Sequence, residues 1–320
     1  MTCRALSTLK PLIESLILAS AVVACSSSQL TVPARSYDDA LGRDFGLTST
    51  AGRIAYLAND GGYWQVWVAV PGQNGARQIT ESPYEKAAVS WFPDGERVLV
   101  HALSGRLFVV DVRSGDEEPF SAASYGGHDA VVSPDGRTIA VSSSLTTNLD
   151  TNEIVLIDVA KREQKVLPSA TGMQHTPSWS SDCDWIYYVA PTDSKLENNL
   201  WRVHRSGLHI EQLTVDAAYQ FAPSVSHEGV VAYASNRTGD YDIWAWDIER
   251  GTQPRQLTNR LGFDGEPDWG PDGRHLAYVA REGTVSTVRI MDAETGRSWE
   301  LANHKRGARA PAWWGALGGE

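Results

Sequence analysis

The sequence has few cysteines, few positive charges and no long hydrophobic run, and each shortage excludes a class of protein. Lysine and arginine number 28 against 39 aspartate and glutamate residues, so the formal net charge is −11, which excludes a basic nucleic-acid-binding domain. An apolar fraction of 42% and a charged fraction of 21% exclude a disordered chain. Tryptophan is abundant, with 12 residues, alongside 28 glycines and 15 prolines, a composition typical of a turn-rich β protein.

Residues 16–24 form an apolar stretch of nine residues near the N-terminus, too short for a membrane-spanning helix, which needs about 20. Positive charges precede this stretch and Cys25 follows it directly, which is the layout of a secretory signal that ends in a bacterial lipobox. We therefore expect residues 1–25 to be a lipoprotein signal peptide, Cys25 to carry lipid after cleavage, and residues 26–52 to form a tether. An ordinary cleaved signal with an incidental cysteine is the alternative.

This reading also predicts where the protein works. We expect it to be exported and anchored through Cys25 on the periplasmic side of a membrane, with the outer membrane favoured because Ser26 follows the cysteine. Cys183 is then the one cysteine left in the folded part, so no intramolecular disulfide can form. Two flanking carboxylates disfavour its thiolate, and we expect a bystander rather than a nucleophile.

One motif recurs along almost all of the remaining chain. Its clearest copy, residues 266–278, reads Glu-Pro-Asp-Trp-Gly-Pro-Asp-Gly-Arg-His-Leu-Ala-Tyr. Aligned on the tryptophan, the copies fall at six positions: Trp91, Val132, Trp179, Val225, Trp269 and Trp313. A period of 40 to 50 residues with about four short alternating strands, separated by glycine and aspartate turns, is the signature of β-propeller blades.

The two ends of the repeat array complement each other. The first repeat begins at residues 53–56, which correspond to a second strand, whereas residues 311–313 form an orphan Pro-Ala-Trp strand. We therefore predict an all-β, six-bladed β-propeller over residues 53–320, with four-stranded blades and a C-terminal strand that completes blade 1. An open solenoid is the alternative, but it would need distinct capping repeats.

The blade architecture predicts where a ligand would bind. We expect the motif tryptophans to pack as wedges between blades, and polar ligand contacts to come from the connections that lead into the first strand of each blade. Residues four and five places before the aligned position form the predicted mouth ring: Lys86, His128, Gln174, His175, Gln220, Asp264 and Arg309. The ring carries both charge signs, which suits a polar ligand or an inserted peptide end; a solvated mouth without a specific ligand is the alternative.

Residues 235–244, Ser-Asn-Arg-Thr-Gly-Asp-Tyr-Asp-Ile-Trp, and the Trp-x-Pro-Asp-Gly units resemble the propeller of the TolB family of the Tol-Pal system. The resemblance covers about residues 53–315. It implies a periplasmic, non-catalytic, protein-binding propeller, with a Pal-like envelope protein among the partners. TolB proteins carry an N-terminal α/β domain before the propeller, whereas only about 27 residues separate Cys25 from Arg53 here.

Catalytic motifs are missing from the sequence. It contains no Gly-x-Ser-x-Gly nucleophile elbow and no phosphate-binding Gly-Lys-Ser/Thr. We therefore expect a non-enzymatic scaffold without metal or cofactor, which binds an envelope protein and the membrane through its lipid, and no nucleic acid. The alternative is a metal-assisted polysaccharide lyase with its site at the propeller mouth, where His128 and His175 with Asp264 or Glu266 would hold the metal.

Overall fold

A computed structural model of the chain describes residues 52–73, 75–120, 128–144, 152–168, 171–192 and 197–315. These residues form 24 β-strands, and none of them lies in a helix that could cross a membrane. The predicted signal peptide with Cys25, and the predicted tether up to residue 51, lie outside the described residues.

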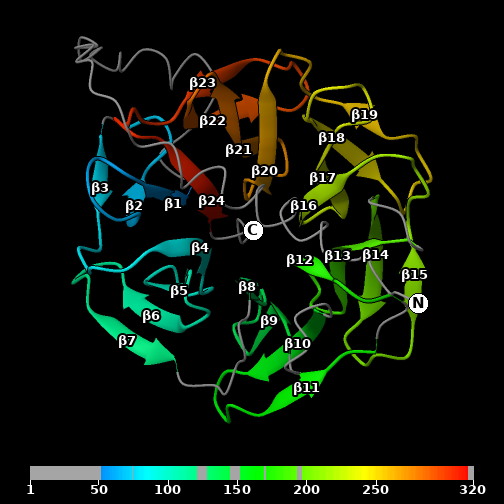
Figure 1. Cartoon of the computed structure of the whole chain (residues 1–320), viewed down its shortest axis with the longest axis horizontal. Helices are drawn as coiled ribbons and strands as arrows, with labels where there is room; N and C mark the ends of the chain where they lie inside the picture. Colours follow the sequence, from blue (N-terminus) through cyan, green and yellow to red (C-terminus); the bar gives the residue numbers. More distant parts are fainter. Residues whose placement is uncertain are drawn as a thin grey trace, which may run out of the picture. The chain divides into compact units, whose positions relative to one another are not determined.

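The strands form six four-stranded antiparallel sheets arranged around a central axis, as Figure 1 shows. Each sheet is one blade. Blades 1 to 3, from the innermost strand outward, contain β24 (Ala308–Trp314), β1 (Arg53–Ala58), β2 (Gln65–Ala69) and β3 (Ala76–Gln78); β4 (Lys86–Trp91), β5 (Arg97–Ala102), β6 (Leu107–Asp111) and β7 (Glu117–Phe120); and β8 (His128–Val132), β9 (Thr138–Ser143), β10 (Glu153–Asp158) and β11 (Gln164–Val166).

Blades 4 to 6 repeat this order. They contain β12 (His175–Trp179), β13 (Trp185–Pro191), β14 (Asn198–His204) and β15 (Ile210–Gln212); β16 (Gln220–Val225), β17 (Val230–Ser235), β18 (Asp242–Asp247) and β19 (Arg255–Gln256); and β20 (Phe263–Trp269), β21 (His275–Glu282), β22 (Val285–Asp292) and β23 (Ser298–Glu300). The predicted six-bladed propeller is confirmed.

The ring is closed by the last strand. β24 pairs antiparallel with β1, with Trp313 opposite Ile54 and Ala312 opposite Ala55. The C-terminal strand therefore completes blade 1, as predicted from the orphan Pro-Ala-Trp. Closure leaves no blade without a neighbour, so no open edge of the ring is exposed to other chains.

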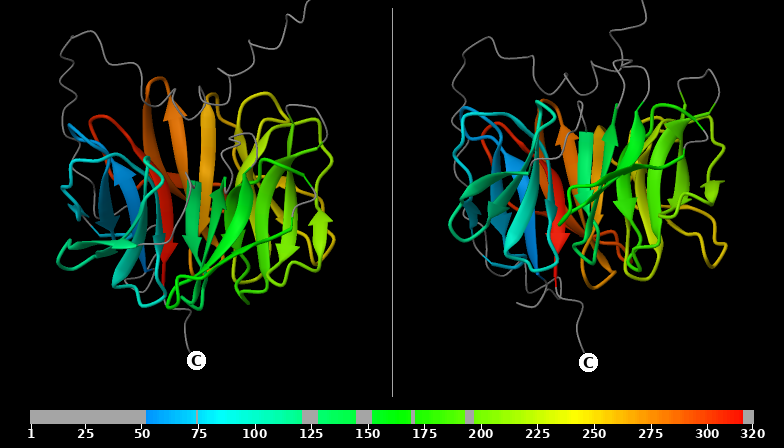
Figure 2. Two further views of the ribbon diagram at one scale, coloured as in Figure 1. Left: turned by 60° about the horizontal axis from the view of Figure 1, so that its bottom comes forward. Right: turned by 90° about the horizontal axis from the view of Figure 1, so that it is seen from below.

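Antiparallel pairing gives the propeller two distinct faces, which Figure 2 shows from the side. We call the face where the innermost strands begin the mouth face; the hairpins between second and third strands open on the same side. The far face carries the turns between first and second strands. At several of these turns an aspartate holds the backbone: Asp272 Oδ1, for example, accepts hydrogen bonds from the N–H groups of Arg274 and His275.

The hydrophobic core lies between neighbouring blades. One buried cluster combines Leu57 and Val66 of blade 1 with Val89, Trp91 and Val98 of blade 2, because both faces of each sheet are covered by other sheets. The motif tryptophans are buried at these seams, as expected.

Two tryptophan hydrogen bonds show how the wedges are oriented. Trp91 Nε1 donates to Ala312 O at 3.0 Å, and Trp179 Nε1 donates to Val131 O at 3.3 Å. In both cases the indole N–H bonds to the innermost strand of the preceding blade, so each tryptophan is held by a hydrogen bond as well as by packing.

Candidate binding site at the mouth of the propeller

The predicted mouth ring lies where each innermost strand begins. Four members are the first residues of their strands: Lys86, His128, His175 and Gln220. Asp264 and Arg309 are the second residues of theirs, and Gln174 directly precedes β12. The side chain of His128 lies outside the described residues. Contact of this ring with a ligand stays a prediction.

The ring residues five places before the aligned position are buried. Each exposes 1% or less of its surface; they are Lys86, Gln174, Gln220 and Asp264. The sequence pattern predicts them to be ligand contacts. Their side chains bond mainly to the preceding blade or to the connection that leaves it. They therefore act as fasteners between blades, and this structural role was not expected from the sequence.

Lys86 shows how a fastener works. Its ammonium group donates to Gln65 Oε1 of blade 1 at 2.8 Å and to Ser82 Oγ at 2.9 Å, and it lies 4.0 Å from the ring centre of Tyr84. Burial lowers the pKa of Lys86 to about 8, against the opposing effect of Glu117 and Glu85. At neutral pH the buried ammonium is thus still charged, and it is compensated by several acceptors.

Two glutamines fasten other seams. Gln174 Oε1 accepts a hydrogen bond from Ile154 N of blade 3 at 2.9 Å. Gln220 Oε1 accepts one from Thr214 Oγ1 at 2.8 Å, and the same hydroxyl accepts from Leu200 N of blade 4 at 2.9 Å. Gln174 thereby supplies an acceptor for a buried backbone N–H, whereas Gln220 shares the Thr214 hydroxyl with Asn199 Oδ1.

Arg309 and Glu266 are half-buried groups of opposite charge near the mouth, and each influences the pKa of the other. Arg309 Nη2 donates to Lys86 O at 3.0 Å, and its guanidinium lies 4.4 Å from the ring centre of Trp64. Burial lowers the pKa of Arg309, with Glu266 and Glu85 opposing, and burial raises the pKa of Glu266. The mouth therefore keeps a positive group beside a negative one, both poorly hydrated.

A ring of bulges with left-handed backbone lies just inside the mouth. The bulged residue, three places before the aligned position, has a φ between 49° and 55° in five blades: Asp129, Thr176, Ala222, Glu266 and Ala310. The strand register shifts at the same points. No glycine relieves these positions, so the backbone is held there against its preference.

The bulges join neighbouring innermost strands. Ala222 N donates to Thr176 Oγ1 at 3.2 Å, and Ala310 N donates to Glu266 Oε2 at 2.7 Å. A second layer lies deeper, where Trp313 N donates to Asp268 Oδ2 at 2.6 Å. Hydrogen bonds between neighbouring blades thus hold the inner wall of the propeller together, and they were not predicted from the sequence.

Blade 6 makes this inner wall acidic. Ser224 Oγ donates to Asp268 Oδ1 at 2.9 Å. The hydrogen bonds from Ser224 and from Trp313 N lower the pKa of Asp268, but burial has the larger effect and raises this pKa to about 6. The sequence contains a signal for this acidity, because blade 6 reads Glu-Pro-Asp where blade 4 reads Thr-Pro-Ser and blade 5 reads Ala-Pro-Ser.

The metal set of the alternative hypothesis includes His128, whose side chain lies outside the described residues, so that set stays untested. No group of three histidine, cysteine, aspartate or glutamate side chains among the described residues could hold an ion. Asp264 instead pairs with Arg260 at 2.8 Å. Cys183 is buried, and burial raises its pKa, which disfavours a nucleophilic thiolate.

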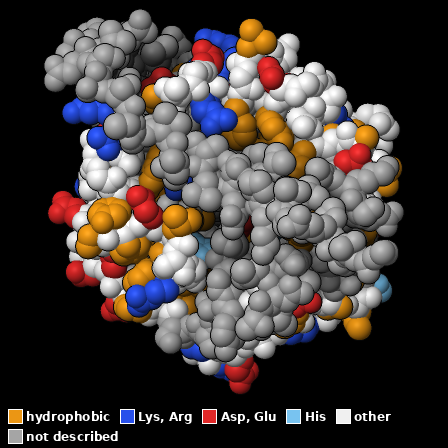
Figure 3. Space-filling view, viewed as in Figure 1, with side chains coloured by type: hydrophobic (Ala, Val, Ile, Leu, Met, Phe, Trp, Pro, Cys, Tyr) orange, Lys and Arg blue, Asp and Glu red, His pale blue; other side chains and the backbone are white. Residues whose placement is uncertain are grey.

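Exposed apolar side chains gather on the mouth face. Seven large hydrophobic side chains are exposed among the described residues, and five lie in mouth-face connections or hairpins: Tyr63, Leu103, Val215, Leu261 and Val285. Next to Leu261, Phe263 stacks on Phe221 with ring centres 5.7 Å apart. Figure 3 shows hydrophobic side chains on this face.

Six four-stranded blades, closed by a C-terminal strand that completes the first, define a six-bladed β-propeller. The family model of the TolB beta propeller domain matches residues 49–315, and the chain belongs to this family.

Two curated relatives are similar over most of the propeller. A TolB homologue of Chlorobium luteolum is 26% identical over 274 residues, covering 80% of this chain and 53% of the relative. An uncharacterized protein of Agrobacterium fabrum is 23% identical over 259 residues, covering 63% of this chain and 87% of the relative. The chain thus spans about half the length of the TolB homologue.

Solved structures share the fold. TolB from Acinetobacter baumannii superposes with a TM-score of 0.71 at 19% identity, covering 83% of this chain and 67% of that chain. An oligogalacturonate lyase in complex with manganese gives a TM-score of 0.55 at 14% identity, covering 81% of this chain and 76% of that chain. At these identities the likeness concerns the fold and not the activity.

Proposed function

We propose that the protein is a non-catalytic propeller of the cell envelope that binds a protein partner through its mouth face. The observation that carries this proposal is the concentration of exposed hydrophobic side chains there. Leu261 and Val215 expose 88% and 86% of their surface, and both lie in connections that lead into innermost strands. Family membership supports the proposal, since TolB propellers belong to the Tol-Pal system, and a Pal-like protein is the partner we would test first.

Charge substitutions on the two faces test the proposal. Leu261→Asp places a carboxylate in the apolar mouth surface and should reduce crosslinking of the partner in intact cells at least tenfold. Leu208→Asp is the matched control, because Leu208 is 81% exposed and lies in a far-face turn. Equal loss in both variants, or no loss in either, would contradict docking at the mouth face. Both side chains are exposed, so both variants should fold normally.

The proposal includes lipid anchoring through Cys25 on the periplasmic side, with the outer membrane favoured. It rests on the sequence of residues 1–26 alone. Cys25→Ser should abolish labelling by radioactive palmitate and should move the protein from the membrane fraction to the soluble periplasmic fraction. Palmitate labelling that persists in this variant would overturn the assignment of Cys25.

A further inference from the structure

A groove on the outer side of the seam between blades 1 and 2 has an unusual lining. It opens toward the far face, away from the mouth, and encloses about 400 Å³. Its walls combine apolar residues at the ends of β2 and β6 with two arginines: Val68, Val70, Ala76, Val112, Arg53 and Arg77. No carboxylate is among the described residues that line it.

Neither arginine of the groove makes an ion pair with a described carboxylate. Arg77 Nη2 donates to Val112 O, a neutral carbonyl. The Arg53 guanidinium lies over indoles, 4.9 Å from the ring centre of Trp314 and 5.7 Å from that of Trp91. Two positive charges thus lie beside this groove without an ion pair to any described carboxylate, in a chain whose net charge is −11.

The equivalent groove between blades 3 and 4 provides an internal comparison. There Lys165 Nζ donates to Arg205 O at 3.1 Å, as Arg77 donates to Val112 O. The two cations of that groove, however, share it with two carboxylates, Asp158 and Glu163. Charge is balanced inside the second groove and unbalanced in the first.

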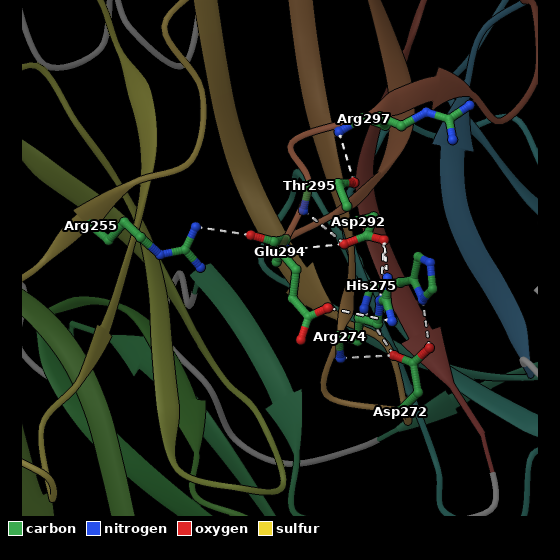
Figure 4. A network of polar contacts seen from close by, with 9 residues as sticks. Arg255, Asp272, Arg274, His275, Asp292, Glu294, Thr295 and Arg297 are labelled. Carbon is green, nitrogen blue, oxygen red and sulfur yellow. Dashed lines mark hydrogen bonds and ion pairs between the residues drawn. The ribbon is translucent and has the colours of Figure 1, made fainter. Parts of the chain in front are cut away.

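A third seam repeats the hydrogen bond from a fourth strand to the backbone of the next blade. Between blades 5 and 6, Arg255 Nη1 donates to Ala293 O at 2.9 Å, and the adjacent carboxylates of Asp292 and Glu294 pair with Arg274 (Figure 4). The backbone clamp from a fourth strand to the next blade is therefore a repeated device. Of the two grooves, the one between blades 1 and 2 has no carboxylate among its described lining residues, whereas the one between blades 3 and 4 has two.

We propose that the groove between blades 1 and 2 binds a phosphate monoester that carries an apolar substituent, through Arg53 and Arg77. Guanidinium groups form forked, charge-assisted hydrogen bonds to phosphate oxygens. A phosphate monoester carries a charge of about −1.5 to −2 at neutral pH, which matches two guanidinium groups. The apolar wall of Val68, Val70 and Val112 then contacts the substituent. The proposal is independent of partner binding at the mouth.

Calorimetric titration of the purified mature protein with hexyl phosphate tests the proposal. We expect one site per chain, binding at least several-fold tighter than inorganic phosphate, and weakening of at least tenfold in Arg77→Gln. Lys165→Gln in the second groove is the matched control and should leave binding unchanged. The proposal is overturned if hexyl phosphate does not saturate a site, if inorganic phosphate binds equally well, or if Arg77→Gln binds normally.

A second variant separates loss of binding from loss of folding. Gln73→Glu adds a carboxylate at an exposed position of the groove lining, without removing either arginine. It should abolish hexyl phosphate binding while keeping or raising the melting temperature, and unchanged binding would contradict the charge argument.

Flotation with vesicles distinguishes the source of the phosphate. Co-flotation with vesicles that contain phosphatidic acid, lost in Arg77→Gln, would assign a lipid headgroup. Binding of hexyl phosphate without co-flotation would assign a soluble ester. Co-flotation that is insensitive to Arg77→Gln would count against the groove. Cys25→Ser protein is used for this arm, so that its own lipid does not contribute.

Discussion

The main-chain N–H of Trp313 donates to Asp268 Oδ2 at 2.6 Å, and this bond ties the last strand of the chain to blade 6. Trp313 also lies opposite Ile54 in the β1–β24 ladder. The C-terminal strand is therefore held from both sides, by hydrogen bonds to blade 1 and by a carboxylate of blade 6.

Asp268 should make stability depend on pH around 6. Burial raises its folded-state pKa from 3.8 to about 6, so the folded protein holds this proton more tightly than the unfolded chain does. The stability contributed by Asp268 is therefore highest below about pH 4 and falls as the pH rises to 6. Asp268→Asn keeps an acceptor for Trp313 N and should stabilise the protein by about 1–3 kcal/mol at pH 7.5.

Thermal melts at pH 5 and pH 7.5 measure this effect. The gain in melting temperature of Asp268→Asn over the native protein should be larger at pH 7.5. An equal gain at both pH values, or a loss at pH 7.5, would contradict a buried and ionised Asp268.

Gly95 tests the packing of β24 against blade 2, because this glycine lies in the turn between β4 and β5. Its φ is +66°, and a Cβ at this position would overlap the indole of Trp314, which follows Trp313 in β24. Gly95→Ala should therefore cost both the left-handed backbone penalty, about 1–2 kcal/mol, and the displacement of Trp314. Gly296→Ala is the control, because Gly296 has a similar φ of +71° and open space around it. Chemical denaturation should show Gly95→Ala as the more damaging change, and equal losses would argue against this contact.

Substitution of Gln220 tests whether the mouth-ring residues are fasteners between blades or ligand contacts. If Gln220 is a fastener, Gln220→Ala removes one acceptor of the Thr214 hydroxyl and the donor to Asp216 Oδ2, and should cost about 1–2 kcal/mol. Gln78→Ala, at an exposed position of β3, should change stability by less than about 0.5 kcal/mol. Partner binding by Gln220→Ala should be unchanged at a temperature where it is folded. A normal melting temperature with lost binding would instead make Gln220 a ligand contact.

The sequence predicts the closed propeller but not the orientation of the polar side chains at its mouth. Tryptophan spacing and the orphan Pro-Ala-Trp are enough to predict six blades and closure by β24, because each blade needs four strands. A residue such as Gln174 can face the channel or the preceding blade, and a bulge of one residue decides which. The bulges at Thr176 and Ala222 contain no glycine that would have revealed them.

Docking at the mouth face is tested most directly by a photo-crosslinking amino acid placed in living cells at Val215 on the mouth face, or at Leu208 on the far face. Both positions are more than 80% exposed, so the probe should disturb neither fold. We expect one envelope protein to be captured from position 215, and not from position 208. Capture of the same protein from position 208 alone would show that the partner binds the opposite face.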